Sequence, residues 1–217
     1  RHRRDGARGL PAVNSVINLS LLSSVFVTLF VIMDPPGTVP VFISLTAGQT
    51  RAVRKKAAWQ AVLVAFGVIV VFAAFGQQIL NHLGITLPAL QCAGGLLLLL
   101  IALQLLTDTA EDPVQTKDVN IAFVPLGTPL LAGPGAIVAT MVFVQRANGS
   151  LPDVVAISVG IVAIHLVMWL TLRFSGVIMR ILGENGVLLV TRIAGLLLSA
   201  IAVQLVADAV TDFIKAG

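Results

Sequence analysis

Two proline–glycine breaks interrupt hydrophobic segments of this chain at corresponding places in its two halves. The first has the sequence MDPPGT at residues 33–38, and the second has the sequence AGPGA at residues 132–136. Proline removes a backbone donor and collides with the preceding helical turn, and in hydrocarbon the freed carbonyl groups find no water. Paired breaks of this kind are typical of the discontinuous helices that surround a transporter's binding site.

The composition places these segments in a membrane. Hydrophobic residues make up 57% of the 217-residue chain and charged residues 11%, whereas soluble domains carry roughly 25% charged residues. The mean hydropathy is +0.99. Because about 20 apolar residues span the hydrocarbon core, the sequence predicts six transmembrane segments, at residues 16–45, 57–80, 88–106, 121–144, 154–172 and 187–210. The first is too long for one straight crossing, and its Asp-Pro-Pro-Gly run indicates where it breaks.

The two halves of the chain resemble each other. Gln104 aligns with Gln204, and the pair Pro36-Gly37 aligns with Pro134-Gly135. Because each half holds an odd number of crossings, the second half enters the membrane from the opposite side. The predicted fold is therefore an all-α membrane protein of six transmembrane segments, built as two inverted three-helix repeats, with segments one and four broken by Pro-Gly motifs. We expect a single transmembrane domain at residues 14–217, with repeat one at about 14–108 and repeat two at about 119–214.

Basic residues in the short loops predict an orientation. The loop at residues 51–56 holds four Lys and Arg residues, and the positive-inside rule places this loop in the cytoplasm and both chain ends outside. The basic N-terminal stretch, residues 1–13, opposes this assignment. We expect that stretch to be either disordered or not native, with translation beginning nearer Val13. N-terminal sequencing of the native protein would decide between the two.

The residues around both breaks resemble the signatures of the MarC family of integral membrane proteins. The first signature corresponds to residues 33–46, MDPPGTVPVFISLT, and the second to residues 129–137, PLLAGPGAI. The resemblance covers residues 16–214. It implies a six-span protein of the bacterial inner membrane that is related to the amino-acid exporters of the LysE type. It also implies neutral amino acid transport, which has been proposed for some members.

A new helix is expected to begin after each break, near Gly37 and near Gly135. Its first free N–H groups carry roughly half a positive charge, which favours a substrate carboxylate. The unwound carbonyl groups before each break suit an ammonium group, a sodium ion or a proton-bearing water. The alternative is that both breaks only kink helices for packing. The candidate substrate-binding residues are Asp34, Pro36, Gly37, Thr38, Thr128, Gly133, Pro134 and Gly135.

Asp34 is the acidic residue that lies well inside an apolar run. A carboxylate at the bilayer centre costs ~3 kcal/mol on insertion scales, so its presence indicates a function. It either caps the helix that begins near Gly37, or it takes and releases a proton and couples transport to the proton gradient. A capping Asp34 would occupy the donors that an anionic substrate needs. Carboxylate binding is therefore expected at the second break.

Three other polar side chains lie within predicted segments. Gln104 and Gln204 are interpreted as interhelical hydrogen-bonding partners, with substrate contact as the alternative. His165, in the middle of segment five, is a possible coupling residue or a satisfied hydrogen-bonding partner. The lone Cys92 gives no thiol metal site, and we expect no cofactor, although coupling to protons or sodium remains open.

These observations favour a secondary transporter of a small solute, a neutral amino acid or related metabolite, with its site at the paired broken helices. The chain contains no phosphate-binding loop, zinc-protease motif or nucleophile elbow, which argues against an enzyme or an ATP-driven pump. A channel-like pore and a non-transporting scaffold or regulatory protein are the alternatives. The expected partners are the solute and membrane lipid, with a homo-oligomer possible. Nucleic acid is not expected, because the basic loop is read as an anchor against anionic lipid headgroups.

Overall fold

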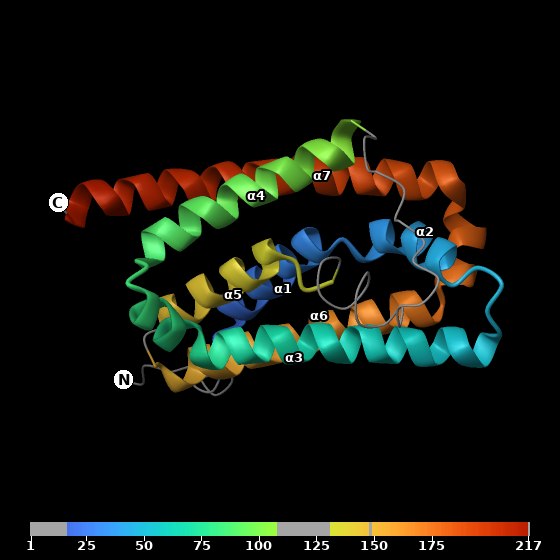
Figure 1. Ribbon diagram of the computed structural model, residues 1–217, viewed down its shortest axis with the longest axis horizontal. Coiled ribbons are helices and arrows are strands. Elements are labelled where there is room, and N and C mark those ends of the chain that lie inside the picture. Colours follow the sequence, from blue (N-terminus) through green and yellow to red (C-terminus); the bar gives the residue numbers. More distant parts are fainter. Residues whose placement is uncertain (1–16, 108–130, 148, 217) are drawn as a thin grey trace, which may run out of the picture.

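A computed structural model describes residues 17–107, 131–147 and 149–216 of the chain (Figure 1). All regular secondary structure in these ranges is α-helical. The helices are α1 (Leu19–Met33), α2 (Pro35–Leu45), α3 (Arg51–Leu83), α4 (Leu87–Thr107), α5 (Pro134–Ala147), α6 (Leu151–Arg173) and α7 (Ser175–Ala216). Helix α7 contains a kink at Gly183, whose φ of 66° and ψ of 175° are not helical.

Within the described ranges, five spans are long and apolar enough to cross a membrane. They are Leu19–Leu45, Arg51–Leu83, Leu87–Thr107, Leu151–Arg173 and Ser175–Lys215. The prediction of an all-helical membrane protein is thereby confirmed. The beginning of the predicted fourth segment lies outside the described residues, and so does the tail at residues 1–13. The 14 residues of α5 make up the end of that segment.

Three layers of helices form the bundle. Figure 1 shows α4 and α7 side by side along one face, α3 and α6 along the opposite face, and α1, α2 and α5 between them. The larger apolar core lies among α1, α3, α5 and α6, and includes the fully buried Leu29, Ile69 and Ile164. The smaller core joins α4 to α7 through residues such as Leu98 and Leu198. Many large apolar side chains on the outer faces are exposed, as expected for a surface that meets lipid.

Glycines allow α4 and α7 to pack closely, because each helix places a glycine against the other. A Cβ atom added at Gly95 of α4 would lie 2.8 Å from the carbonyl oxygen of Ala202 and 2.8 Å from a methyl of Val206 on α7. One added at Gly195 of α7 would lie 3.1 Å from Leu105 and 3.4 Å from the carbonyl oxygen of Ala102 on α4. Small residues permit this approach because helix association in lipid relies on close packing.

The two short helices also pack in a reciprocal manner. Helix α2 packs against α6 and α7, whereas α5 packs against α3 and α4. Each short helix that follows a Pro-Gly break therefore contacts the two long helices of the other half of the chain.

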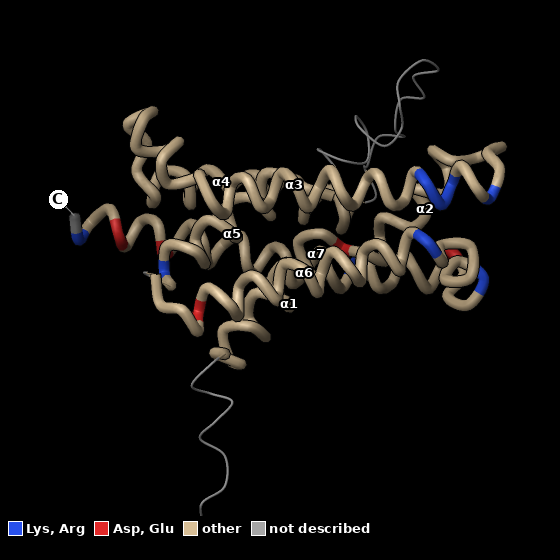
Figure 2. The backbone as a smooth tube through the Cα atoms, turned by 90° about the horizontal axis from the view of Figure 1, so that it is seen from below, with Lys and Arg blue, Asp and Glu red and all other residues tan. Residues whose placement is uncertain are grey.

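Most of the charged residues gather at the two ends of the bundle (Figure 2). Figure 2 shows most of the Lys and Arg residues at the end formed by α2 and the beginning of α3, whereas the end that holds the C-terminus carries both signs of charge. Near the first of these ends, Trp59 of α3 and Trp169 of α6 pack edge to face with ring centroids 6.1 Å apart, and the guanidinium of Arg173 lies 6.0 Å from the Trp169 ring. Tryptophan and arginine are enriched at membrane–water interfaces.

We expect Gly95→Ala to destabilise the bundle by about 1–3 kcal/mol, because the new methyl group overpacks a contact with backbone. Gly195→Ala should destabilise it less, because its neighbours are more distant and are mostly side chains. Gly67→Ala on α3 is the matched control, since a Cβ there meets nothing within 4 Å. The measurement is the midpoint of denaturant unfolding of the purified protein in detergent. Equal effects of the three substitutions would contradict the glycine-mediated contact.

Candidate functional site

The junction between α1 and α2 is formed by Asp34. Its backbone is left-handed, with φ 40° and ψ 68°, and Asp34 is the described non-glycine residue with positive φ. Its N–H donates to the carbonyl of Phe30 at 3.0 Å, which closes α1. Its Oδ1 accepts a hydrogen bond from the N–H of Gly37 at 3.2 Å, which caps α2. One residue thus ends one helix and begins the next, and the capping role is the one that the structure shows.

The N-terminus of α2 has no free donor for an anion. Pro35 and Pro36 lack N–H groups, the N–H of Gly37 bonds to the Asp34 side chain, and the N–H of Thr38 donates to the Asp34 carbonyl at 3.1 Å. The donors near Gly37 that are candidates for binding a substrate carboxylate are thus engaged within the junction, as expected for a capping Asp34. The reason is that two prolines and an aspartate use every position of the first turn.

A pair of buried oxygen atoms lies next to Gly37. Asp34 is 7% exposed; its Oδ2 faces Oγ1 of Thr191 on α7 without a hydrogen bond of good geometry, and neither atom has another partner among the described residues. A Cβ at Gly37 would collide with Asp34 Oδ2 and would lie 2.9 Å from Thr191 Oγ1. The absence of a side chain at Gly37 is what lets these two oxygens approach each other. Such oxygens are ligands for a proton or a hard cation.

Thr38 faces α6. Its hydroxyl donates to the Pro35 carbonyl at 2.8 Å, and the Sδ of Met168 lies 3.7 Å away. The hydroxyl therefore satisfies a carbonyl of the first turn of α2. Pro36 is half-buried in the same turn.

The described residues at the beginning of α5 use glycine where the α1–α2 junction uses an acid. The carbonyl of Gly133 accepts hydrogen bonds from Ala136 at 3.0 Å and from Ile137 at 3.3 Å, and the N–H of Gly135 has no partner among the described residues. Gly135 is buried against Leu98 of α4, and a Cβ there would collide with that side chain. Pro134 is exposed. Counting described residues alone, the beginning of α5 has an N–H without a partner and α2 does not; Thr128 lies outside these residues.

Both junctions lie near the middle of the bundle's length in Figure 1. Their helices have different main partners, because α2 packs on α6 and α7 whereas α5 packs chiefly on α3 and α4; both also contact α6. A site that uses both would have to span the space between the two halves.

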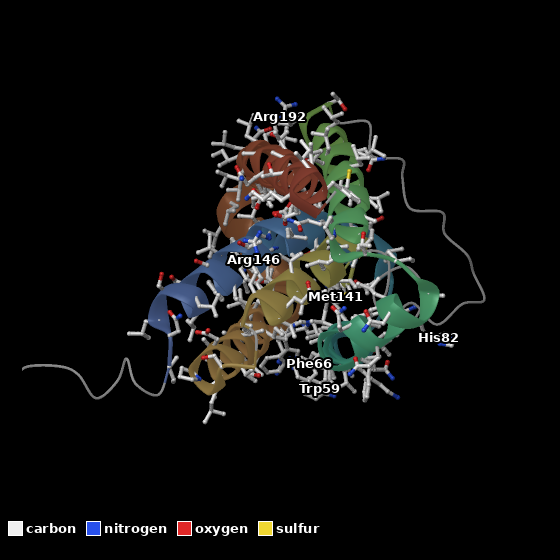
Figure 3. The ribbon with its side chains drawn as sticks, turned by 90° about the vertical axis from the view of Figure 1, so that its left-hand side faces the viewer. Trp59, Phe66, His82, Met141, Arg146 and Arg192 are labelled. Atoms are coloured by element: carbon white, nitrogen blue, oxygen red, sulfur yellow. The ribbon has the colours of Figure 1, made fainter. Side chains whose placement is uncertain are left out.

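His165 of α6 is buried, one turn from Met168. Its Nδ1 donates to the Ile161 carbonyl at 2.7 Å, and its ring lies edge-on to Phe66 of α3 with centroids 5.2 Å apart. One ring nitrogen of His165 is therefore satisfied within its own helix. Its Nε2 is buried without a partner among the described residues. Phe66 and Trp59, labelled in Figure 3, lie on the same side of the bundle.

The two glutamines, Gln104 of α4 and Gln204 of α7, are exposed. Gln204 donates to Oδ1 of Asp208, one turn along its own helix, at 2.6 Å. Asp208 in turn bonds to Arg146 of α5. The glutamine therefore joins α7 to α5 through a carboxylate and not by a direct bond between buried amides.

Sequence reasoning missed Thr191, Met168 and Arg146. Thr191 is a polar residue inside the predicted sixth segment, which was the signal available for it. Met168 carries no such signal, and Arg146 lies just beyond the end of the predicted fourth segment. Within the described ranges, no group of three or more His, Cys, Asp or Glu residues could hold a metal ion.

A bundle of apolar helices with a buried acid at a helix junction defines an integral, multi-pass membrane protein. The chain belongs to the MarC family: the model described as "MarC family integral membrane protein" matches residues 19–214. This membership confirms the resemblance noted in the sequence.

Three relatives illustrate the membership. A UPF0056 membrane protein of Methanocaldococcus jannaschii is 37% identical over 85% of this chain and 93% of its own length. The UPF0056 membrane protein YvbG of Bacillus subtilis is 32% identical over 86% of this chain and 92% of its own length. The UPF0056 inner membrane protein MarC of Salmonella typhimurium is 32% identical over 87% of this chain and 93% of its own length. No solved structure matches.

Substitutions at Asp34 should separate its two structural tasks. Asp34→Asn keeps a capping oxygen and tolerates the left-handed backbone, so we expect its stability to remain within about 0.5 kcal/mol of the wild type. Asp34→Gly keeps the backbone and loses the side-chain cap, with little expected cost. Asp34→Ala loses the cap and strains the backbone, and should lose about 2 kcal/mol or more. Thermal unfolding in detergent measures the series, and an Ala variant as stable as the Gly variant would contradict the strained junction.

Proposed function

We propose that this chain is a secondary transporter of a small solute of the neutral amino acid class, with its site between the two helix junctions. The observation that carries the proposal is the Asp34 junction. A half-satisfied carboxylate inside an apolar bundle costs free energy that packing alone does not require. A group that must bind and release a proton or cation during a cycle accounts for it.

The architecture proposed for this transporter is the inverted repeat. Reciprocal packing supports it: Gly95 meets Ala202 and Val206, and Gly195 meets Ala102 and Leu106, with each contact displaced by about one hundred residues from the other. The packing of α2 and of α5 supports the inverted repeat as well, because each of these short helices contacts the two long helices of the other half of the chain. Two halves related in this way can alternate access by moving against each other around a fixed site.

The two junctions differ in polarity, and this difference supports a zwitterionic solute. Asp34 and Thr191 present oxygens, whereas the beginning of α5 presents the N–H of Gly135 and the positive end of a helix dipole. The ammonium or coupling cation would face Asp34, and the carboxylate would face Gly135. This assignment moves carboxylate binding away from Gly37, where the donors are already used.

We propose the inner membrane as the location, as in the name of the Salmonella relative. The proposed orientation has the end with the beginning of α3 in the cytoplasm, which is supported by the concentration of basic residues there (Figure 2).

Liposomes containing the purified protein should show counterflow of labelled neutral amino acids. Asp34→Asn should retain counterflow, because exchange does not need net movement of the coupling ion. Its rate of gradient-driven uptake should fall at least about tenfold. Uptake is measured with and without proton and sodium gradients. Gradient-driven uptake by Asp34→Asn equal to that of the wild type would remove Asp34 as the coupling group.

The role of Gly135 is tested by the double variant Gly135→Ala/Leu98→Ala. The smaller side chain at position 98 makes room for the new methyl group, so the double variant should fold while its methyl group covers the N–H of the second junction. We expect counterflow to fall at least about tenfold relative to Leu98→Ala alone, which is the matched control. Full counterflow by the double variant would place the solute elsewhere.

A further inference from the structure

A cavity with polar side chains on part of its lining lies away from the helix junctions, between α1, α5 and α7. It has a volume of about 190 Å³, which suits a molecule much smaller than the drug-sized ligands of ordinary pockets. Its mouth is lined by Arg146, Gln204 and Asp208, and Thr28 of α1 contributes a hydroxyl. Figure 3 shows Arg146 in the space between α5 and α7. Arg146 lies eleven residues after Gly135 in the sequence, which is about 16 Å along α5.

Opposite charges meet at this mouth. Nη2 of Arg146 lies 2.9 Å from Oδ2 of Asp208, and the amide of Gln204 donates to Oδ1 of the same carboxylate at 2.6 Å. The guanidinium offers a planar fork of donors that fits a carboxylate or a phosphate. Asp208 is held in place by Gln204, so it can accept an ammonium group without moving.

The ion pair is easily opened. Its side chains are 58% and 30% exposed, and ion pairs exposed to this degree contribute about 0–1 kcal/mol. A ligand that carries both charges can replace the pair and give each side chain a new partner. A ligand with one charge would leave the other side chain without its partner, so it should bind more weakly.

The rest of the cavity is apolar. Ala139, Val142 and Phe143 of α5 and Ile201 and Leu205 of α7 form its walls. A polar mouth above an apolar floor matches a molecule whose two charges lie at one end and whose side chain is apolar.

We propose that this cavity is a binding site for a zwitterion, with the anionic group on Arg146, the ammonium group on Asp208 and the apolar part among Ala139, Ile201 and Leu205. The same chemistry is found in a free amino acid and in the headgroup of phosphatidylethanolamine. The site does not depend on the transporter proposal, since it holds whether or not the solute crosses the membrane.

The test is equilibrium binding to the full chain in nanodiscs made of phosphatidylglycerol. The probes are L-leucine, L-alanine and two analogues of leucine with one charge each, 4-methylpentanoate and 3-methylbutylamine. We expect L-leucine to bind at least about tenfold more tightly than either analogue, a difference of about 1.4 kcal/mol. Arg146→Gln and Asp208→Asn should each lower L-leucine affinity at least about tenfold and abolish this preference.

Matched controls are available in the same chain. Asp212 lies one turn beyond Asp208 on α7, and Arg180 lies outside the cavity. Neither Asp212→Asn nor Arg180→Gln should therefore alter L-leucine binding. Ile201→Phe fills the floor while both charges remain, so it should weaken L-leucine more than L-alanine. A purely structural ion pair would not respond to ligand size in this way.

The outcomes separate this site from the one at the helix junctions. Loss of L-leucine binding in Arg146→Gln but not in Asp34→Asn or Gly135→Ala/Leu98→Ala supports the cavity. A weaker L-leucine affinity in nanodiscs that contain phosphatidylethanolamine identifies the lipid as a competing occupant of the same site. No L-leucine or L-alanine binding in phosphatidylglycerol nanodiscs, or binding unchanged by Arg146→Gln, Asp208→Asn and Ile201→Phe, would overturn the proposal.

Discussion

Backbone hydrogen bonding in hydrocarbon governs how this chain can be broken. A helix that ends inside a membrane exposes donors and acceptors that no water satisfies, and each unsatisfied group costs several kcal/mol. At the α1–α2 junction two prolines remove donors, Gly37 and Thr38 turn theirs toward Asp34, and Asp34 directs its own N–H to Phe30. The break therefore leaves no free donor in the first turn of α2, and a side-chain oxygen of Asp34 lies buried beside it.

The location of that unsatisfied oxygen links the break to the rest of the bundle. Asp34 Oδ2 lies by Gly37 together with the hydroxyl of Thr191, which comes from the other half of the chain. Any movement of α7 relative to α2 changes the surroundings of the carboxylate. The second junction has no acid, and it packs its glycine against Leu98 instead. The two breaks therefore share a sequence pattern while they offer different chemistry.

The positions of the membrane spans could be predicted from the sequence because they depend on local composition and not on tertiary contacts. A run of about twenty apolar residues predicts a crossing by its length alone, and five such spans are found. Asp34 as a cap followed from its place before Pro-Pro-Gly, and the missing donors at α2 follow from the same two prolines. The neighbours of Asp34 did not follow, because Thr191 is more than 150 residues away in the sequence and only packing brings it near. Arg146 and Asp208 are a similar case: Gln204 and Asp208 share a helix face by their spacing, but the arginine that meets them belongs to another helix.

The contact between α4 and α7 has the form of an isologous dimer interface inside one polypeptide. In such an interface residue i meets residue j, and j meets i, as Gly95 meets Val206 and Gly195 meets Leu106. The two copies are not equally tight, since a Cβ atom added at Gly95 would have its nearest neighbours 2.8 Å away, whereas one added at Gly195 would have them 3.1 Å away. A homodimer cannot relax one copy of a contact without relaxing the other. A single chain can, and in this one the side of the contact toward the end of α4 is the less tightly packed one.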